Sequence, residues 1–172
     1  MKRTTKYVLA ALFTAIIAVL AQIALPLPSG IPLTLQIFTV ALCGFWLKWY
    51  GVLSVATYIL LGLIGAPVFS HFGAGPSVLF GQTGGYIFGF LLLACACSLS
   101  QKTKNKLLKI SIVFIGIIVC HLCGIVQFSL IWKQGFFEAF VICSAPFLLK
   151  DLVLVYTALG VSNLIKKRIK TC

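Results

Sequence analysis

The sequence predicts an all-α integral membrane protein, a bundle of six transmembrane helices with both termini on the cytoplasmic side. Three observations lead to this fold class: the apolar composition, the lengths of the apolar segments, and the positions of the basic residues. Of the 172 residues, 61% are hydrophobic and only 9% are charged. A soluble domain of this length carries far more charge. We therefore expect the surplus apolar side chains to face lipid.

Six apolar segments account for most of the chain, and each full span needs roughly 20 residues. They comprise residues 7–25, 33–47, 51–65, 81–99, 110–131 and 149–165. The second and third segments are shorter than a full span, so an alternative count fuses or discards one of them. A tight link around Lys48 joins them, and its aromatic residues Trp49 and Tyr50 are typical of a membrane interface. We expect a single membrane domain over residues 1–172.

The basic residues decide between the two counts. With six spans, 12 of the 14 lysines and arginines lie on one side of the membrane: at the two ends, at Lys48 and in the loop before residue 110. Cytoplasmic loops carry such an excess of Lys and Arg, so we predict a multi-pass protein of the cytoplasmic membrane, in contact with lipid. Any odd number of spans would place a basic cluster outside. The net charge of +12 forms no basic stripe with interleaved aromatics, so we expect no nucleic-acid partner.

The N-terminal residues also resemble a signal peptide, with basic residues before an apolar run. The run over residues 7–25 is long enough to span a membrane, and residues 26–30 contain no convincing small-residue cleavage site. We therefore expect a retained first helix.

Metal and nucleotide sites find little support in the sequence. Cys120, His121 and Cys123 lie close together, but zinc needs about four ligands and no second cluster supplies them. No phosphate-binding loop ends in Lys-Ser or Lys-Thr. We expect no metal and no cofactor, and any ATP-driven step would need another subunit.

Only two acidic residues occur, Glu138 and Asp151. Asp151 stands at the start of the last predicted span, near a helix N-terminus, where the macrodipole favours negative charge. It is either a cap or ion-pair partner of Lys150 or Lys133, or an acceptor for a polar ligand. We favour the ligand role, because ionisable residues at membrane depth usually line a cavity.

Polar and glycine-rich residues gather at the predicted outer ends of the spans. Gln36 opens the second span beside Thr34, although a lone Gln in a bundle commonly bonds to a neighbouring helix. Three glycines surround Gln82 and Thr83 and let backbone approach a ligand closely, with Gly85 among them, and Tyr86 adds a flat surface with a hydroxyl.

The two predicted external loops, residues 66–80 and 132–148, are long and rich in Gly, Pro and aromatic residues. Such loops are more often lids or binding elements than simple connections. We expect a short interfacial helix over residues 135–143.

Other features fit packing or docking. Ala11 and Ala15 form a small-xxx-small pair that lets another helix approach closely, either within the bundle or from a partner protein. His71 and His121 have no obvious nucleophile or carboxylate beside them in sequence, so both are interpreted as structural. We expect no catalytic residues.

The chain resembles the BioY family, whose members are substrate-capture (S) components of energy-coupling factor (ECF) transporters for biotin. The resemblance rests on four motifs, in the family's order: PLTLQ from residue 32, YILLGLIGAPVF from residue 58, GQTGGYIFGF from residue 81, and Pro146-Phe147 followed by Asp151. The similarity runs from the first span to the last. The second and third motifs together are quite specific.

This resemblance implies a six-helix bundle that binds biotin near the outer face. It also implies docking, through Ala11 and Ala15 on the first helix, to a transmembrane coupling protein driven by two ATPases. The family's acidic residue falls on Asp151. Gln82 replaces the proline usual before the Thr-Gly-Gly-Tyr motif, and Leu154 stands where the family usually has lysine. Lys150, Lys133 or backbone N–H groups are then left to hold a ligand carboxylate.

Biotin suits the residues on offer, because its ureido ring presents two N–H donors and one carbonyl acceptor. The predicted substrate-binding residues are Thr34, Gln36, Thr83, Gly85, Tyr86, Lys150 and Asp151. The alternatives are a carrier for another small vitamin-like carboxylic acid, and an intramembrane enzyme using Asp151, a histidine and Glu138. The sequence is compatible with action alone, as a homo-oligomer, or with ECF partners.

Overall fold

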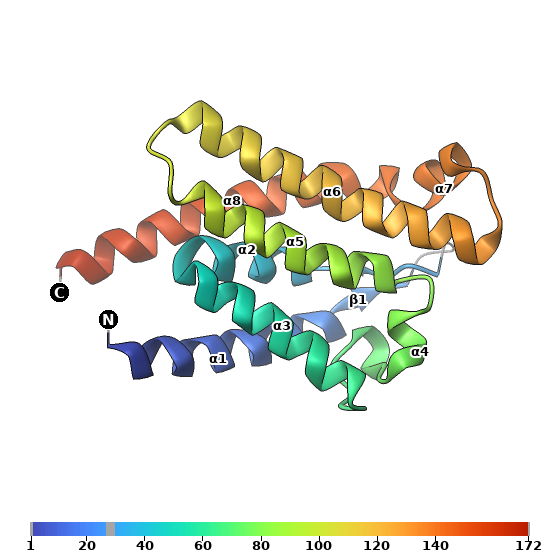
Figure 1. Cartoon of the computed structure of the whole chain (residues 1–172), viewed down its shortest axis with the longest axis horizontal. Helices are drawn as coiled ribbons and strands as arrows, with labels where there is room; N and C mark the ends of the chain where they lie inside the picture. The colour runs from blue at the N-terminus through green and yellow to red at the C-terminus, as the bar shows by residue number, and fades with distance from the viewer. Residues whose placement is uncertain (1, 27–29, 172) are drawn as a thin grey trace.

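Helices make up almost all of the computed structural model, which describes residues 2–26 and 30–171, with side chains up to residue 168 (Figure 1). The elements, in chain order, are α1 (Arg3–Gln22), β1 (Ala24–Leu25), β2 (Leu33–Thr34), α2 (Gln36–Leu47), α3 (Trp49–Leu63), the 3-10 turn η1 (Ser70–Phe72), α4 (Pro76–Leu79), α5 (Gly84–Ser100), α6 (Lys106–Trp132), α7 (Phe136–Cys143) and α8 (Ala145–Thr171).

Each of the six predicted apolar segments contains a long helix: α1, α2, α3, α5, α6 and α8. Three of these, α1, α6 and α8, are long and apolar enough to cross a membrane. The other three have 12, 15 and 17 residues and are shorter than the roughly 20 residues of a complete span. The predicted short helix over residues 135–143 is confirmed as α7.

Two predicted boundaries differ from the structure. The first segment ends in strand β1, where Ala24 pairs antiparallel with Thr34 and Leu25 with Leu33. Pro26 follows directly, and the residue before a proline is disfavoured in helical conformation. At the other end of the chain, α8 begins at Ala145, earlier than the predicted residue 149. Residues 27–29, where the absence of a cleavage site was judged, lie outside the described part.

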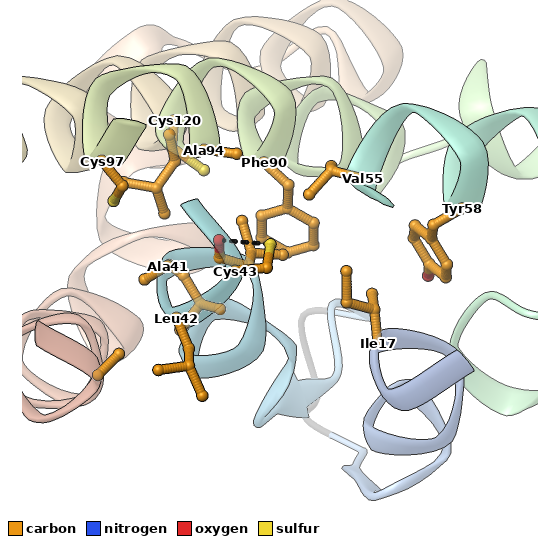
Figure 2. Close-up of a cluster of buried hydrophobic side chains, with 14 of the residues drawn as sticks. Ile17, Ala41, Leu42, Cys43, Val55, Tyr58, Phe90, Ala94, Cys97 and Cys120 are labelled. Carbon is orange, nitrogen blue, oxygen red and sulfur yellow. Dashed lines mark hydrogen bonds between the residues drawn. The ribbon is translucent and has the colours of Figure 1, made fainter. Parts of the chain in front are cut away.

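Helix α2 lies at the centre of the bundle, packed against α1, α3, α5 and α8. Ten of its 12 residues are buried. A single residue, Lys48, separates α2 from α3 and adopts a positive φ of 57°, which lets the chain reverse within one position. Fully buried side chains of neighbouring helices, including Ile17 and Val55, complete this core (Figure 2).

The two ends of the bundle differ in structure. Both chain termini, the α2–α3 turn and the α5–α6 connection lie at one end (Figure 1). At the other end lie β1, β2, η1, α4 and α7 (Figure 1); we call this the loop end. The predicted external loops therefore fold at the loop end, because η1 and α4 belong to the first of them and α7 to the second.

Candidate functional site

A cavity of about 520 Å³ lies at the loop end, enclosed by eight segments of the chain. Segments from the β1–β2 hairpin, α2, α3, η1, α4, α5, α6 and α8 all contribute to its wall. Six of the seven predicted substrate-binding residues line it, namely Thr34, Gln36, Thr83, Tyr86, Lys150 and Asp151. These residues are spread over more than 100 positions of the sequence, so tertiary packing alone brings them together.

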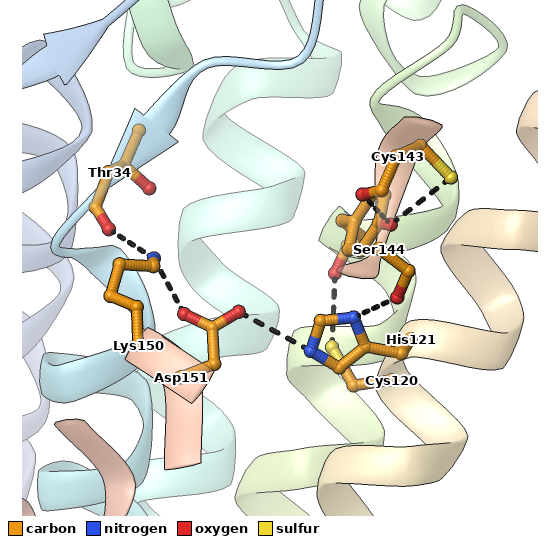
Figure 3. Close-up of polar contacts among 8 residues, drawn as sticks. Thr34, Cys120, His121, Cys143, Ser144, Lys150 and Asp151 are labelled. Atoms are coloured by element: carbon orange, nitrogen blue, oxygen red, sulfur yellow. Dashed lines mark hydrogen bonds and ion pairs between the residues drawn. The ribbon is translucent and has the colours of Figure 1, made fainter. Parts of the chain in front are cut away.

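Buried Asp151 and half-buried Lys150 form an ion pair on the wall of the cavity. Lys150 Nζ lies 2.6 Å from Asp151 Oδ1 and donates a hydrogen bond to the Thr34 carbonyl at 2.9 Å (Figure 3). Asp151 is only 6% exposed, and a buried carboxylate needs such a partner to offset its lost hydration. Of the two ion-pair partners that the sequence left open for Asp151, the structure shows Lys150. The alternative partner, Lys133, is exposed at the end of α6 and lies outside the cavity lining.

The expected helix-dipole contribution at Asp151 is wrong. Helix α8 begins at Ala145, so Asp151 stands in the second turn of the helix. The influence of the macrodipole falls off within the first turn. The ammonium group of Lys150 is therefore the main stabilising charge for this carboxylate.

Gln36, the first residue of α2, holds a second polar cluster in the cavity wall. Its Nε2 donates to the Tyr58 hydroxyl at 2.7 Å, and its Oε1 accepts from Thr34 Oγ1 at 3.1 Å and Ser70 Oγ at 3.4 Å. These bonds join the hairpin, α2, α3 and η1. Tyr58 is almost fully buried and its ring packs edge-on against Phe69. Gln36 thus bonds to neighbouring elements, as a lone glutamine in a bundle commonly does, and also faces the cavity.

The glycine-rich segment at the start of α5 contributes both to the cavity wall and to helix packing. Thr83 and Tyr86 line the cavity, whereas Gly85 is buried outside its lining. A Cβ at Gly85 would collide with the backbone carbonyl of Cys123 on α6. The absence of a side chain at Gly85 therefore allows close packing of α5 on α6, and it does not bring backbone to a ligand as the sequence suggested.

Gln82 bridges the exposed rim of the cavity. Its Nε2 donates to the Gly30 carbonyl at 3.1 Å, and its Oε1 accepts from Trp132 Nε1 at 3.1 Å. We call Gly30, Gln82 and Trp132 the rim bridge. It joins the β1–β2 connection to the end of α6, so the glutamine that departs from the usual family residue has a defined structural contact.

His121 contacts a carboxylate after all, which corrects the interpretation of this residue as isolated. Its Nε2 lies 3.4 Å from Asp151 Oδ2, and its Nδ1 lies 2.5 Å from Ser144 Oγ (Figure 3). His121 stands behind Asp151 and is absent from the cavity lining. His71, in η1, lines the cavity itself.

The arrangement suits binding of a small molecule. The cavity wall combines the Lys150–Asp151 pair with apolar and aromatic side chains such as Phe69, Phe90 and Phe147, the usual composition of a ligand pocket. Ser144 completes a Ser–His–Asp line but is fully buried and outside the lining, so a substrate cannot reach it. Among the described residues, no group of three or more potential ligands could hold a metal ion.

Several cavity residues had no distinct signal in the sequence. Tyr58, Phe69 and Phe147 read as ordinary aromatic residues in apolar segments. Their role depends on neighbours supplied by other helices, as in the bond between Tyr58 and Gln36. All three residues lie in the motifs that carry the family resemblance, and this was the only signal in the sequence that marked them.

The predicted docking residues lie apart from the cavity. Ala11 and Ala15 are both exposed on the surface of α1, and the opposite face of that helix packs on α2 and α3. The small-residue pair is therefore accessible at the surface of the bundle.

Comparison with known proteins agrees with the fold. A model of the BioY family matches residues 1–171. The chain is 38% identical over 162 residues to the biotin transporter BioY of Thermotoga maritima, covering 92% of this chain and 94% of that protein. It is 35% identical over 156 residues to the probable biotin transporter BioY of Pyrococcus horikoshii, covering 90% and 92%. A crystal structure of the S-component for biotin from an ECF-type ABC transporter matches with a TM-score of 0.83, covering 97% of this chain and 95% of that one at 22% identity.

Proposed function

The chain belongs to the BioY family, and from this premise we propose that it captures biotin for uptake across the cytoplasmic membrane, as the substrate-binding component of an ECF-type transporter. The observation that carries the proposal is the Lys150–Asp151 ion pair on the wall of a cavity of about 520 Å³. The relatives with 38% and 35% identity are named as a biotin transporter and a probable biotin transporter.

The Lys150–Asp151 pair matches the ureido ring of biotin. Asp151 offers carboxylate oxygens to the ureido N–H groups. Lys150 has three ammonium protons, of which one is directed to Asp151 and one to Thr34, so a third is available for the ureido carbonyl. The aromatic walls, with Tyr86 and Phe147, receive the thioether ring and the valeryl chain.

This orientation also places the carboxylate of biotin. Because Lys150 Nζ and Asp151 Oδ1 are 2.6 Å apart, one ligand cannot put its ureido ring on Asp151 and its distant carboxylate on Lys150. The carboxylate would instead lie toward the exposed rim, near Thr83 at the start of α5. The N-terminus of a helix attracts anions through its unpaired N–H groups.

We further propose that the six long helices all span the membrane, with the two termini in the cytoplasm. The termini, the α2–α3 turn and the α5–α6 connection share one end of the bundle (Figure 1), and 12 of the 14 Lys and Arg residues belong to these regions. The positive-inside rule then makes this end cytoplasmic and the cavity external. Ala11 and Ala15, exposed on α1, would contact a transmembrane coupling protein that carries ATPase subunits. A homo-oligomer is an alternative assembly.

Biotin binding by the purified chain in lipid nanodiscs tests the proposed function. We expect one-to-one binding by calorimetry, and a loss of affinity of roughly 10- to 100-fold in Asp151→Asn, because a hydrogen bond to a charged group contributes about 1.5–3 kcal/mol. Glu138→Gln is the matched control, since Glu138 is the other acid and is exposed outside the cavity.

Two outcomes would contradict the proposal. Wild-type affinity in Asp151→Asn would remove the ligand role of Asp151. Preferential binding of a different vitamin-like acid in competition with biotin would favour the alternative carrier function. The intramembrane-enzyme alternative loses its basis, because Glu138 stands apart from Asp151 and His121 on the exposed surface of α7.

A further inference from the structure

Three buried side chains form a line that ends at the cavity. Ser144 connects α7 to α8, His121 lies in the middle of α6, and Asp151 lies on α8. Ser144 Oγ is 2.5 Å from His121 Nδ1, and His121 Nε2 is 3.4 Å from Asp151 Oδ2. Their exposures are 0%, 3% and 6%, and only Asp151 lines the cavity. The line therefore reaches the Asp151 carboxylate from His121 and Ser144, which lie outside the cavity lining (Figure 3).

The hydrogen-bonding capacity of these groups selects one tautomer of His121. A neutral imidazole has one N–H donor and one acceptor nitrogen. If Nδ1 carried the proton, the Nε2 lone pair would face the Asp151 carboxylate inside the protein, an unfavourable contact. With the Ser144 hydroxyl donating to Nδ1, the Nε2–H points at Asp151 Oδ2. The Asp151 carboxylate, which can only accept, thus selects the Nε2–H tautomer, and the Ser144 hydroxyl completes the line by donating to Nδ1.

The distances leave Asp151 able to accept from a ligand. Its Oδ1 is held by Lys150 at 2.6 Å. The 3.4 Å separation of Oδ2 from His121 Nε2 is longer than an ordinary N–H···O hydrogen bond, so Oδ2 is oriented by the imidazole and its acceptor capacity is not used up. A ligand N–H entering from the cavity meets an oxygen whose direction is already fixed.

The aromatic packing holds the imidazole in place. The Tyr86 ring stands edge-on to His121, with centroids 5.8 Å apart and planes at 88°. The Tyr86 hydroxyl donates to the Cys143 carbonyl at 2.6 Å, next to Ser144. Tyr86 itself lines the cavity, so one residue contacts the ligand space, the histidine and the α7–α8 junction.

We propose that His121 is a positioning residue that, together with Ser144, orients the Asp151 carboxylate for an N–H donor of the ligand. The inference rests on the proposed function, since it assigns Asp151 to the ureido N–H groups of biotin. It adds that His121, which contacts neither ligand, contributes to the discrimination between biotin and an analogue whose ureido N–H is blocked by a methyl group.

Two substitutions of His121 test the contributions of Nε2 and Nδ1 separately. The amide of glutamine reaches the position of Nε2, whereas that of asparagine ends near Nδ1. His121→Gln therefore keeps a donor toward Asp151, and His121→Asn keeps only the contact to Ser144. The probes are biotin and its two mono-N-methylated ureido forms. We expect the wild-type chain to prefer biotin over at least one methylated form by roughly tenfold or more.

We expect His121→Asn to reduce this preference by roughly fivefold, the effect of about 1 kcal/mol, and His121→Gln to retain most of it. Ser144→Ala should reduce it less than His121→Asn. Ser98→Ala is the matched control, because Ser98 is also buried, its hydroxyl has no partner among the described residues, and it lies outside the cavity lining. If His121 had only a structural role, His121→Asn would weaken the binding of biotin and of its methylated forms equally and leave the preference unchanged.

The tautomer gives a second readout that needs no ligand. In ¹⁵N-histidine NMR spectra, His121 is identified as the signal that remains in His71→Asn. We expect a protonated Nε2 and an unprotonated Nδ1. The opposite tautomer would overturn the proposal, as would an unchanged preference in well-folded His121→Asn. If the wild-type chain failed to bind biotin while NMR showed the expected tautomer, the proposed function would fail and the ligand part of this inference with it.

Discussion

At the scale of single residues, the free-energy cost of placing a polar side chain in an apolar span explains which positions could be predicted. A carboxylate or an amide in an apolar span is expensive unless it is paired or functional, so Asp151 and Gln36 were recognisable from sequence, and both line the cavity. His121 was not recognisable, because its partners Ser144 and Asp151 lie 23 and 30 positions further along the chain. Only the packing of α6 beside the α7–α8 junction brings these groups within reach.

Gln82 illustrates a residue whose effect depends on its contacts. Gln82→Ala removes both hydrogen bonds of the rim bridge. Because Gly30 and Trp132 on either side of Gln82 line the cavity, we expect bound ligand to leave faster, by roughly fivefold or more for the loss of about 1 kcal/mol. Displacement of labelled biotin by excess unlabelled biotin measures the dissociation rate.

The matched control is Gln134→Ala. Gln134 follows the end of α6, two positions after Trp132, but its Oε1 has no hydrogen-bond partner among the described residues and it lies outside the cavity lining. Equal dissociation rates for the wild-type chain and Gln82→Ala would show that the rim bridge does not retain the ligand.

At the scale of elements, the apolar segments predicted the order of six helices, of which α1, α6 and α8 are long and apolar enough to cross a membrane. The boundaries were less predictable, because they depend on local competition. Pro26 favours extended backbone at Leu25, which pairs with Leu33 in the hairpin. Helix α6 begins where the Asn105 side chain accepts hydrogen bonds from the backbone N–H groups of Leu107 and Leu108, a standard N-cap.

Helix α1 carries the prediction for partner docking. Tryptophan at Ala11 or Ala15 would fill the exposed small-residue face and prevent close approach of another helix. We expect labelled-biotin uptake by cells that also contain the coupling and ATPase proteins to fall at least several-fold, while biotin binding by the purified variants is unchanged. Binding is spared because α1 contributes no residue to the cavity lining.

Ile115→Trp is the control for this experiment. Ile115 is 59% exposed but lies on α6, on the far side of the bundle from α1 (Figure 1). Normal uptake by Ala11→Trp, or equal losses in Ile115→Trp, would contradict docking through α1.

At the scale of the whole molecule, the basic residues and the cavity lie at opposite ends of the bundle. Basic residues concentrate at the end of the bundle that contains both termini, and the cavity occupies the loop end (Figure 1). Short helices α2, α3 and α5 accompany the longer α1, α6 and α8. The hairpin, η1 and α4 lie at the loop end and contribute to the cavity wall, whereas α7 lies at the same end outside the cavity lining (Figure 1).

Reporter fusions test the proposed orientation. Alkaline phosphatase is active only outside the cytoplasm, whereas green fluorescent protein fluoresces when folded inside it. We expect fusions after Lys104, between α5 and α6, to fluoresce and to lack phosphatase activity. Fusions after Lys133, between α6 and α7, should show the reverse. Phosphatase activity at Lys104 would invert the predicted topology.

The sequence by itself determined that this chain is a helical membrane bundle, how its long helices follow one another, and which family it resembles. These properties depend on hydrophobicity, charge and short motifs, and each of these is local in the chain. The tertiary structure decided that Gly85 is a packing residue, that Lys150 and not Lys133 pairs with Asp151, and that His121 stands behind that carboxylate. These contacts depend on the relative rotation and depth of helices distant in sequence, which no local pattern specifies.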